Sequence, residues 1–121
     1  MSLLRASFYR QMLMIALVLN SRDAIAALCQ RYGVSSLEVF GSATTGAFRE
    51  GESDIDFIVE FEDSSPGLAN RYLDLAESLE CLLEHRVDLL VEPTLANPYL
   101  RHTVNASREQ VCGHRRRQAA A

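Results

Sequence analysis

The 121-residue sequence contains no lysine, and all 12 of its basic residues are arginine. The absence of lysine excludes catalysis through a lysine Schiff base and excludes the lysine of a P-loop phosphate site. A phosphate site in this chain therefore has to be built from arginine side chains, backbone amides and metal ions. The 16 acidic residues give a formal net charge of −4 at pH 7. Because a negative charge does not favour contact with a nucleic-acid duplex, no direct binding to nucleic acid is expected.

Cysteine is scarce and lacks the spacing of a metal site. Cys29, Cys81 and Cys112 form no CxxC pair, and no histidine lies close enough in sequence to suggest a zinc site. Free cysteine commonly behaves as a small buried hydrophobic residue, and disulfides are rare in reducing compartments. The sequence therefore predicts three small buried cysteines and a cytoplasmic location.

A long hydrophobic run is also missing. The run from Met12 to Leu19 is too short to span a membrane. An Ala-x-Ala pattern at residues 24–26 follows a charged pair and fits poorly as a signal-peptidase site. Neither membrane association nor export is expected. Residues 1–20 are expected to form an additional N-terminal helix, or the natural start lies at Met12 or Met14.

The composition is that of an ordinary globular domain, with 48% hydrophobic and 23% charged residues. The sequence shows no internal repeat and no linker long enough to separate two domains. We expect an N-terminal extension over residues 1–20, one domain over residues 21–113 and a polar tail over residues 114–121. The arginine triplet in that tail is expected to be a solvated chain end.

Helices and strands are predicted to alternate along the domain. Helices are indicated by apolar residues three or four positions apart, and strands by short apolar runs that end at turn residues. The expected order is a helix from Ser21 to Gly33, a strand from Val34 to Phe40, a short helix from Ser42 to Ala47, a strand from Asp54 to Phe61, a helix from Leu68 to Glu84, a strand from Arg86 to Val91, and a final helix that starts near Thr94 or Asn97 and ends by Gly113.

Two carboxylates interrupt the apolar strand that follows the Gly41-Ser42 turn. In Ser53-Asp54-Ile55-Asp56-Phe57, the side chains of Asp54 and Asp56 are expected on one face of the strand, because successive residues of a strand point to opposite faces. Two neighbouring carboxylates repel each other unless a cation lies between them. A divalent metal, most simply Mg²⁺, is the expected partner because it prefers oxygen ligands.

A third carboxylate, Asp88, interrupts the next apolar strand in the same way. If the long helix is a right-handed crossover, this strand lies parallel to and beside the previous one, with the two N-terminal ends together. The three carboxylates would then converge on one metal site. The alternative is an ion pair between Asp88 and Arg86, two residues away.

Gly41-Ser42, Asp54-x-Asp56 and Asp88 together resemble the DNA polymerase β-type nucleotidyltransferase superfamily. The sequence is most similar to its minimal bacterial branch, the MNT-domain proteins that act as antitoxins to HEPN-domain toxins. The resemblance extends from about Ser21 to Gly113. It implies an α/β (α+β) nucleotidyltransferase fold, with a small three-stranded mixed sheet flanked by helices.

The resemblance also implies a reaction and a set of roles. Backbone amides after Gly41 and the Ser42 hydroxyl would hold the β- and γ-phosphates of ATP. Asp54, Asp56 and Asp88 would be the catalytic residues and the ligands of two Mg²⁺ ions, with Asp88 also helping to remove the proton of the acceptor. AMP would pass to a hydroxyl, typically of tyrosine, on a HEPN-type partner, and pyrophosphate would leave.

The sequence departs from the family pattern at two points. The family commonly has arginine at the position of Thr45, and its loop before the first aspartate often has ten residues, whereas eleven separate Ser42 from Asp54 here. Arg49 is the candidate to replace the missing cation. These departures favour, as an alternative, a catalytically weak or inactive nucleotide-binding antitoxin that acts by complex formation. A haloacid-dehalogenase-type phosphatase fits less well, because its aspartate pair follows a strand instead of opening one.

Overall fold

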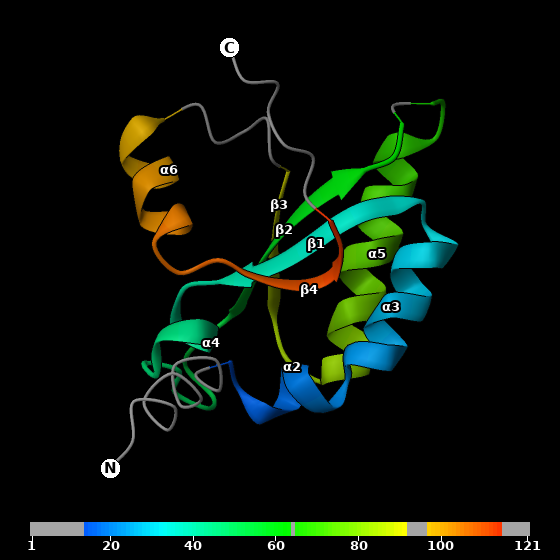
Figure 1. The fold of residues 1–121 in the computed structure, drawn as a ribbon. Helices are drawn as coiled ribbons and strands as arrows, with labels where there is room; N and C mark the ends of the chain where they lie inside the picture. The colour runs from blue at the N-terminus through cyan, green and yellow to red at the C-terminus, as the bar shows by residue number, and fades with distance from the viewer. Residues whose placement is uncertain (1–13, 64, 92–96, 115–121) are drawn as a thin grey trace.

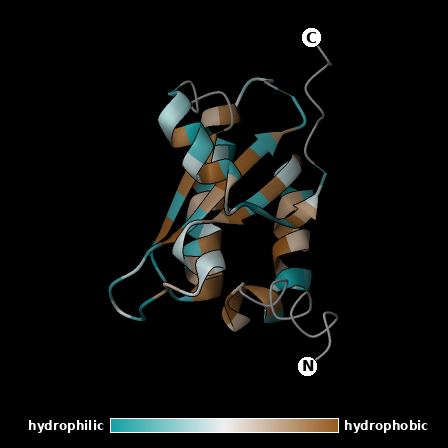
Figure 2. Ribbon diagram, turned by 60° about the vertical axis from the view of Figure 1, so that its left-hand side comes forward, coloured by the Kyte–Doolittle hydropathy of each residue, from teal (hydrophilic) through white to brown (hydrophobic). Residues whose placement is uncertain are grey.

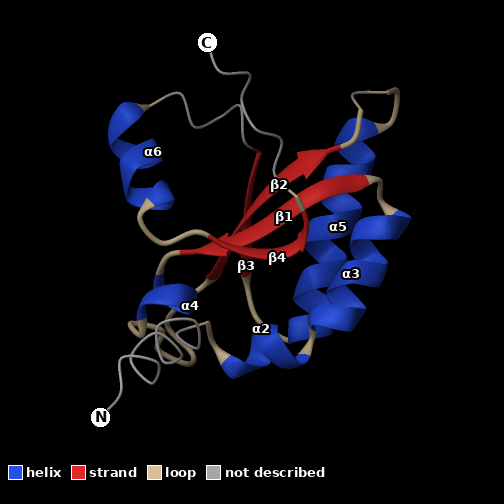
Figure 3. Ribbon diagram, viewed as in Figure 1, coloured by secondary structure: helices blue, strands red, loops and turns tan. Residues whose placement is uncertain are grey.

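The computed structural model describes residues 14–63, 65–91 and 97–114. Helices cover one face of a mixed sheet, and a shorter helix lies at the other side of the sheet (Figure 1 and Figure 3). The elements along the chain are α2 (Ala16–Asn20), α3 (Arg22–Arg31), β1 (Val34–Phe40), α4 (Ser42–Thr45), β2 (Ile55–Phe61), α5 (Leu68–Leu83), β3 (Val87–Val91), α6 (Pro98–Asn105) and β4 (Glu109–Gly113). No helix in these ranges is long and apolar enough to cross a membrane.

The sheet has the strand order β3-β2-β1-β4. β1 is antiparallel to both β2 and β4, whereas β2 and β3 are parallel, with Asp56 directly opposite Asp88 in the register. The 16-residue helix α5 connects the two parallel strands. The predicted parallel arrangement of these strands, with their N-terminal ends together, is confirmed.

The fourth strand corrects the prediction of a final helix that ends by Gly113 and of a three-stranded sheet. The helix begins where expected, with the Asn97 side chain accepting a hydrogen bond from the backbone N–H of Tyr99 at 2.9 Å. It ends at Asn105, and the following residues pair with the free edge of β1. The sequence was misleading because Val104 and Val111 are seven residues apart, which fits one face of a helix as well as two separate elements.

Alternation along the strands divides the hydrophobic residues between two faces (Figure 2). The larger core lies between the sheet and helices α3 and α5, and the central strand β2 contributes Ile55, Phe57 and Val59 to it. A small cluster on the opposite face joins Phe40, Ile58 and Val104, so that α6 packs there. The second face is therefore only partly covered, and Asp56 and Asp88 belong to it by strand alternation.

The N-terminal extension contributes to the core within its described part. Val18 of α2 is fully buried, and the backbone N–H of Ile15 donates to the carbonyl of Ala43 in α4 at 2.9 Å. Of the N-terminal helix expected over residues 1–20, the described residues include the short helix α2 at Ala16–Asn20, and the extension as a whole stays a prediction. Residues 1–13 and the arginine triplet of the tail lie outside the described residues.

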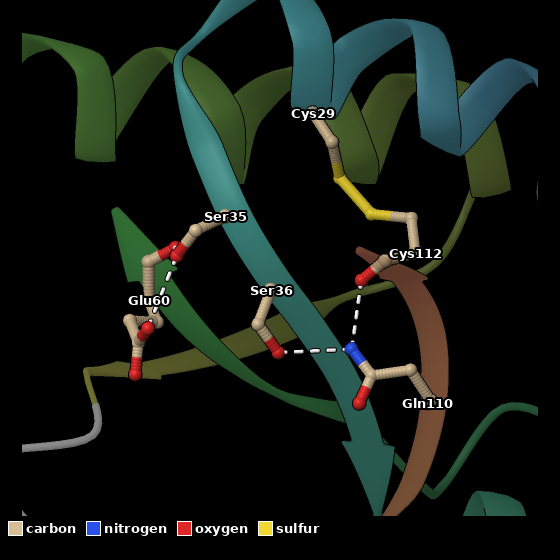
Figure 4. Close-up of a disulfide and its surroundings, with 6 residues drawn as sticks. All are labelled: Cys29, Ser35, Ser36, Glu60, Gln110 and Cys112. Carbon is tan, nitrogen blue, oxygen red and sulfur yellow. Dashed lines mark hydrogen bonds between the residues drawn. A yellow bond between two sulfur atoms is a disulfide. The ribbon is translucent and has the colours of Figure 1, made fainter. Parts of the chain in front are cut away.

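The cysteines differ from the prediction. Cys29 of α3 and Cys112 of β4 form a disulfide (Figure 4), and Cys81 is exposed. The prediction of three small buried residues was wrong for Cys81, and it missed the disulfide because it did not foresee the strand that brings Cys112 to α3. Since disulfides are unusual in reducing compartments, the cytoplasmic location expected from the sequence stays a prediction.

Candidate functional site

The turn between β1 and α4 holds Gly41 directly against a carboxylate of the next strand. Gly41 has φ = 70°, a left-handed conformation that glycine adopts without strain. A Cβ added at this position would lie 2.8 Å from Oδ2 of Asp56. Glycine is thus required here twice, for the backbone conformation and for the close approach of the carboxylate.

The three predicted aspartates lie close enough together to influence one another. Asp56 and Asp88 are opposite each other on adjacent parallel strands, and Asp54 immediately precedes β2. Burial, followed by the negative charges of Asp88 and Asp54, raises the pKa of Asp56 to about 6. A carboxylate in this state gains from a bound cation, because the cation offsets both the lost solvation and the repulsion.

Arg86 lies beside this carboxylate cluster and contacts Asp54, with Nε 3.1 Å from Oδ1. The alternative partner suggested by the sequence, Asp88, is not the one observed. Both side chains of the pair are largely solvent-exposed, at 73% for Arg86 and 45% for Asp54. An exposed ion pair of this kind contributes at most about 1 kcal/mol, so Asp54 can exchange Arg86 for another cation at low cost.

The two departures from the family pattern are both at the surface. Thr45 is exposed at the end of α4, and the exposed Arg49 lies 3.9 Å from Glu52 within its own loop. Arg49 therefore pairs with Glu52 in its own loop, and the arginine that lies beside the carboxylates is Arg86.

Sequence reasoning missed Ser107 and Arg108, which follow α6. The Ser107 hydroxyl accepts a hydrogen bond from the Gly41 N–H at 3.0 Å, and Arg108 pairs with Glu38 in β1. A short sequence pattern indicates neither contact, because each contact joins residues about 70 positions apart in the chain. A signal did exist: Glu38 stands alone among apolar neighbours in a strand, and a buried carboxylate requires a cationic partner.

The donor set suits Mg²⁺, although the described residues contain no ready-made group of three or more His, Cys, Asp or Glu side chains that could hold a metal ion. Asp56 and Asp88 supply hard oxygen donors on adjacent strands, and Mg²⁺ is often bound by only one or two carboxylates together with substrate phosphates and water. Asp54 would join them after leaving Arg86.

The sequence profile of the family described as nucleotidyltransferase domain matches residues 21–110. The chain belongs to this family. It is therefore a nucleotidyltransferase, as the Gly41-Ser42 turn and the aspartates implied, and the matched range includes all five of these residues. The fourth strand is a difference in detail from the three-stranded sheet that was expected, within the same fold.

Two relatives of this nucleotidyltransferase are archaeal proteins. One from Methanocaldococcus jannaschii, provisionally named a protein adenylyltransferase, is 39% identical over 77 residues, which are 64% of this chain and 76% of the relative. The protein adenylyltransferase MntA of Thermococcus cleftensis is 43% identical over 68 residues, which are 56% of this chain and 66% of the relative.

Solved structures share the fold of this nucleotidyltransferase. A provisionally named minimal nucleotidyltransferase has a TM-score of 0.62 and 38% identity, covering 74% of this chain and 88% of that chain. A toxin–antitoxin with AMP-PNP has a TM-score of 0.59 and 26% identity, covering 77% and 73%. A Shewanella oneidensis complex of a tri-AMPylated HEPN toxin with its MNT antitoxin has a TM-score of 0.55 and 22% identity, covering 80% and 73%, and shows likeness of fold alone.

Proposed function

We propose that this nucleotidyltransferase transfers AMP from ATP, in a Mg²⁺-dependent reaction, to a hydroxyl of a HEPN-type toxin, and so acts as its antitoxin. The observation that carries the proposal is the placement of Asp56 opposite Asp88, with the Gly41 turn against the Asp56 carboxylate. This arrangement sets a candidate phosphate-binding turn beside a candidate metal site. The names of the archaeal relatives favour AMP as the group transferred and a protein as the acceptor.

Each residue of the site has a distinct part in this reaction. The backbone amides after Gly41 and the Ser42 hydroxyl would bind the β- and γ-phosphates, and the three aspartates would hold Mg²⁺. The metal, when bound, supplies positive charge to the phosphates and to the attacking oxygen. Asp88 accepts the proton of the acceptor hydroxyl, whose oxygen bonds to the α-phosphorus while the bond to the bridging oxygen breaks and pyrophosphate leaves.

Arg86 is placed to support the same reaction. Its guanidinium lies at the edge of the carboxylate cluster, in an exposed ion pair with Asp54. It would be free to leave Asp54 if that carboxylate were to hold the metal. A released arginine beside the phosphates would take the part of the arginine that the family commonly has at the position of Thr45. Arginine suits this task because its planar group of donors matches phosphate oxygens.

The partner is inferred from assemblies with the same fold. A toxin–antitoxin of this fold is described with AMP-PNP, and a more distant one contains a tri-AMPylated HEPN toxin. A hetero-oligomer with a HEPN-type toxin in the cytoplasm is therefore proposed for this chain.

Labelled ATP provides the test. The protein, Mg²⁺ and a HEPN-type protein encoded beside it are incubated, and the mass of the HEPN protein is expected to rise by one or more AMP groups. Asp88→Asn is expected to abolish the transfer. Asp74→Asn, which makes the same change on the exposed face of α5, is the control and keeps it. The proposal would be contradicted if the HEPN-type protein gained no AMP from the wild-type nucleotidyltransferase and none from the Asp88→Asn variant.

A second function is favoured by Thr45 and by the ion pair that occupies Asp54. The protein would then bind the nucleotide and the toxin and neutralise the toxin by complex formation alone. The double variant Asp54→Ala with Asp56→Ala distinguishes the two functions. It protects cells from the toxin if binding is sufficient, and it fails to protect them if AMP transfer is required.

A further inference from the structure

The residues that join α6 to β4 reach across the sheet to the Gly41 turn. Ser107 Oγ lies 3.0 Å from the Gly41 nitrogen, and the Gly41 N–H donates to it across a separation of 66 residues. The Thr44 hydroxyl lies 2.7 Å from the carbonyl oxygen of Ser107 and 3.0 Å from that of Gly41. Since a hydroxyl carries one proton, Thr44 donates to one carbonyl at a time, and it connects the two segments when it donates to Ser107, the nearer of the two acceptors.

A buried ion pair fixes this connection to the sheet. Arg108 makes two hydrogen bonds to the Glu38 carboxylate, from Nε at 2.9 Å and from a terminal nitrogen at 2.6 Å. The two side chains are only 7% and 8% exposed. Arg108 also donates to Asn105 at the end of α6. Ser107 is thus the neighbour of a residue that is held rigidly on β1.

We propose that Ser107 is a positioning residue for the nucleotide site, acting through Gly41. Gly41 lies between two groups, the Ser107 hydroxyl on its N–H and the Asp56 carboxylate on the side where a Cβ would be. The hydrogen bond to Ser107 fixes the orientation of the peptide group between Phe40 and Gly41, from which the chain enters the turn before Ser42. It also occupies the Gly41 N–H, so the amides that meet the phosphates are those after Gly41. This inference rests on the proposed function, because it assigns the turn to nucleotide phosphates.

The experiment compares two serine-to-alanine variants. Ser107→Ala removes the hydroxyl at the turn. Ser35→Ala is the matched control, because it removes a hydroxyl that donates to the Glu60 carbonyl near the opposite end of β1 (Figure 4). Binding of AMP-PNP in the presence of Mg²⁺ is measured by titration calorimetry, and thermal unfolding is measured for each variant.

Ser107→Ala is expected to weaken AMP-PNP binding about five- to tenfold, the effect of one lost hydrogen bond. Ser35→Ala is expected to bind within about twofold of wild type despite a comparable loss of thermal stability. Ser107→Thr keeps the hydroxyl and is expected to restore most of the affinity. Equal or tighter binding by Ser107→Ala would overturn the inference, as would an equal weakening by Ser35→Ala.

The outcome is distinguishable from failure of the proposed function. If wild type binds AMP-PNP but transfers no AMP, AMP transfer is refuted, and the binding comparison still decides the role of Ser107. If wild type transfers AMP and Ser107→Ala binds as wild type does, only the role of Ser107 is refuted. If wild type binds no AMP-PNP, both are refuted.

Discussion

Asp56 combines partial burial with two negatively charged neighbours, and these raise its pKa from 3.8 to about 6. The folded state therefore holds the Asp56 proton more tightly than the unfolded state does. Between the two pKa values the folded state binds the Asp56 proton and the unfolded state has lost it. The free energy of unfolding therefore falls as the pH rises through this range. Above about pH 6 Asp56 is ionised in both states, and the metal-free protein has lost all of the stability that the shifted pKa gives it at low pH.

The variant Asp56→Asn avoids this loss of stability. In the absence of metal and nucleotide, it is expected to raise the free energy of unfolding at pH 7.5 by about 1 kcal/mol, after discounting for the part of the side chain in solvent. Below about pH 4, where wild-type Asp56 is protonated in both states, the gain is expected to disappear. Urea unfolding at the two pH values measures this difference, with the exposed Asp74→Asn as control. A variant less stable than wild type at pH 7.5 would contradict the electrostatic argument.

Gly41 offers a second prediction at the scale of single residues. Gly41→Ala places a Cβ 2.8 Å from Asp56 Oδ2 and forces alanine into φ = 70°. Gly51→Ala is a matched control, because Gly51 has φ = 81° and nothing within 4 Å of the added Cβ. Each variant is expected to lower the free energy of unfolding by about 1 kcal/mol, because alanine is strained in this left-handed backbone conformation.

Gly41→Ala is expected to lower the free energy of unfolding by at least about 1 kcal/mol more than Gly51→Ala does, because a close contact in a packed site adds steric strain of about this size. It is also expected to bind AMP-PNP at least tenfold more weakly, whereas Gly51→Ala binds as wild type does. Urea unfolding and titration calorimetry measure the two effects. Equal stability and equal binding of the two variants would show that the contact between Gly41 and Asp56 has no consequence.

The positions of some site residues could be predicted from the sequence and those of others could not, and the difference has a physical reason. The placement of Asp54, Asp56 and Asp88 followed from strand alternation, which is a local rule, and from the handedness of a crossover, which is a general rule of topology. Ser107 contacts the site through hydrogen bonds between segments distant in sequence, and such contacts leave no periodic pattern. The pairing of Arg86 with Asp54 depends on a choice between two nearby carboxylates that sequence spacing does not decide.

At the scale of elements, the long helix α5 and the strands β1, β2 and β3 were predictable because each has one strong pattern. The leucines of α5 repeat at helical spacing, and β1, β2 and β3 are short apolar runs ended by turn residues. β4 was not predictable in this way. Its short run has one core residue, Val111, and it is a strand because β1 offers an unpaired edge. Tertiary pairing decided its conformation.

The Glu38–Arg108 ion pair is expected to hold this end of the fold together. Arg108→Met leaves a buried carboxylate without its cation and is expected to lower the free energy of unfolding by about 3 kcal/mol or more. The double variant Glu38→Met with Arg108→Met removes both charges and is expected to regain most of that loss. Urea unfolding of both variants and of Glu38→Met gives the coupling energy of the pair. A double variant as unstable as the sum of the single ones would contradict a direct interaction.

At the scale of the whole molecule, the two faces of the sheet have different tasks. Helices α3 and α5 bury one face and provide the main hydrophobic core. The other face carries Asp56 and Asp88 and is packed by α6 through a small cluster. The proposed acceptor hydroxyl, which has to reach the α-phosphate, therefore approaches from the side that the core does not occupy.

The disulfide between Cys29 and Cys112 connects the first helix of the family domain with the last strand of the sheet, across 83 residues of sequence. A cross-link that encloses a loop of this length stabilises a fold by up to about 4 to 5 kcal/mol in the chain-entropy model. Reduction, or Cys112→Ser, is expected to lower the urea midpoint clearly, whereas Cys81→Ser, which removes the exposed free thiol, leaves it unchanged. Alkylation followed by mass spectrometry of the non-reduced protein is expected to find one free thiol. Three free thiols in air-oxidised protein, or a midpoint unaffected by reductant, would show that β4 is held by strand pairing and the Glu38–Arg108 ion pair alone.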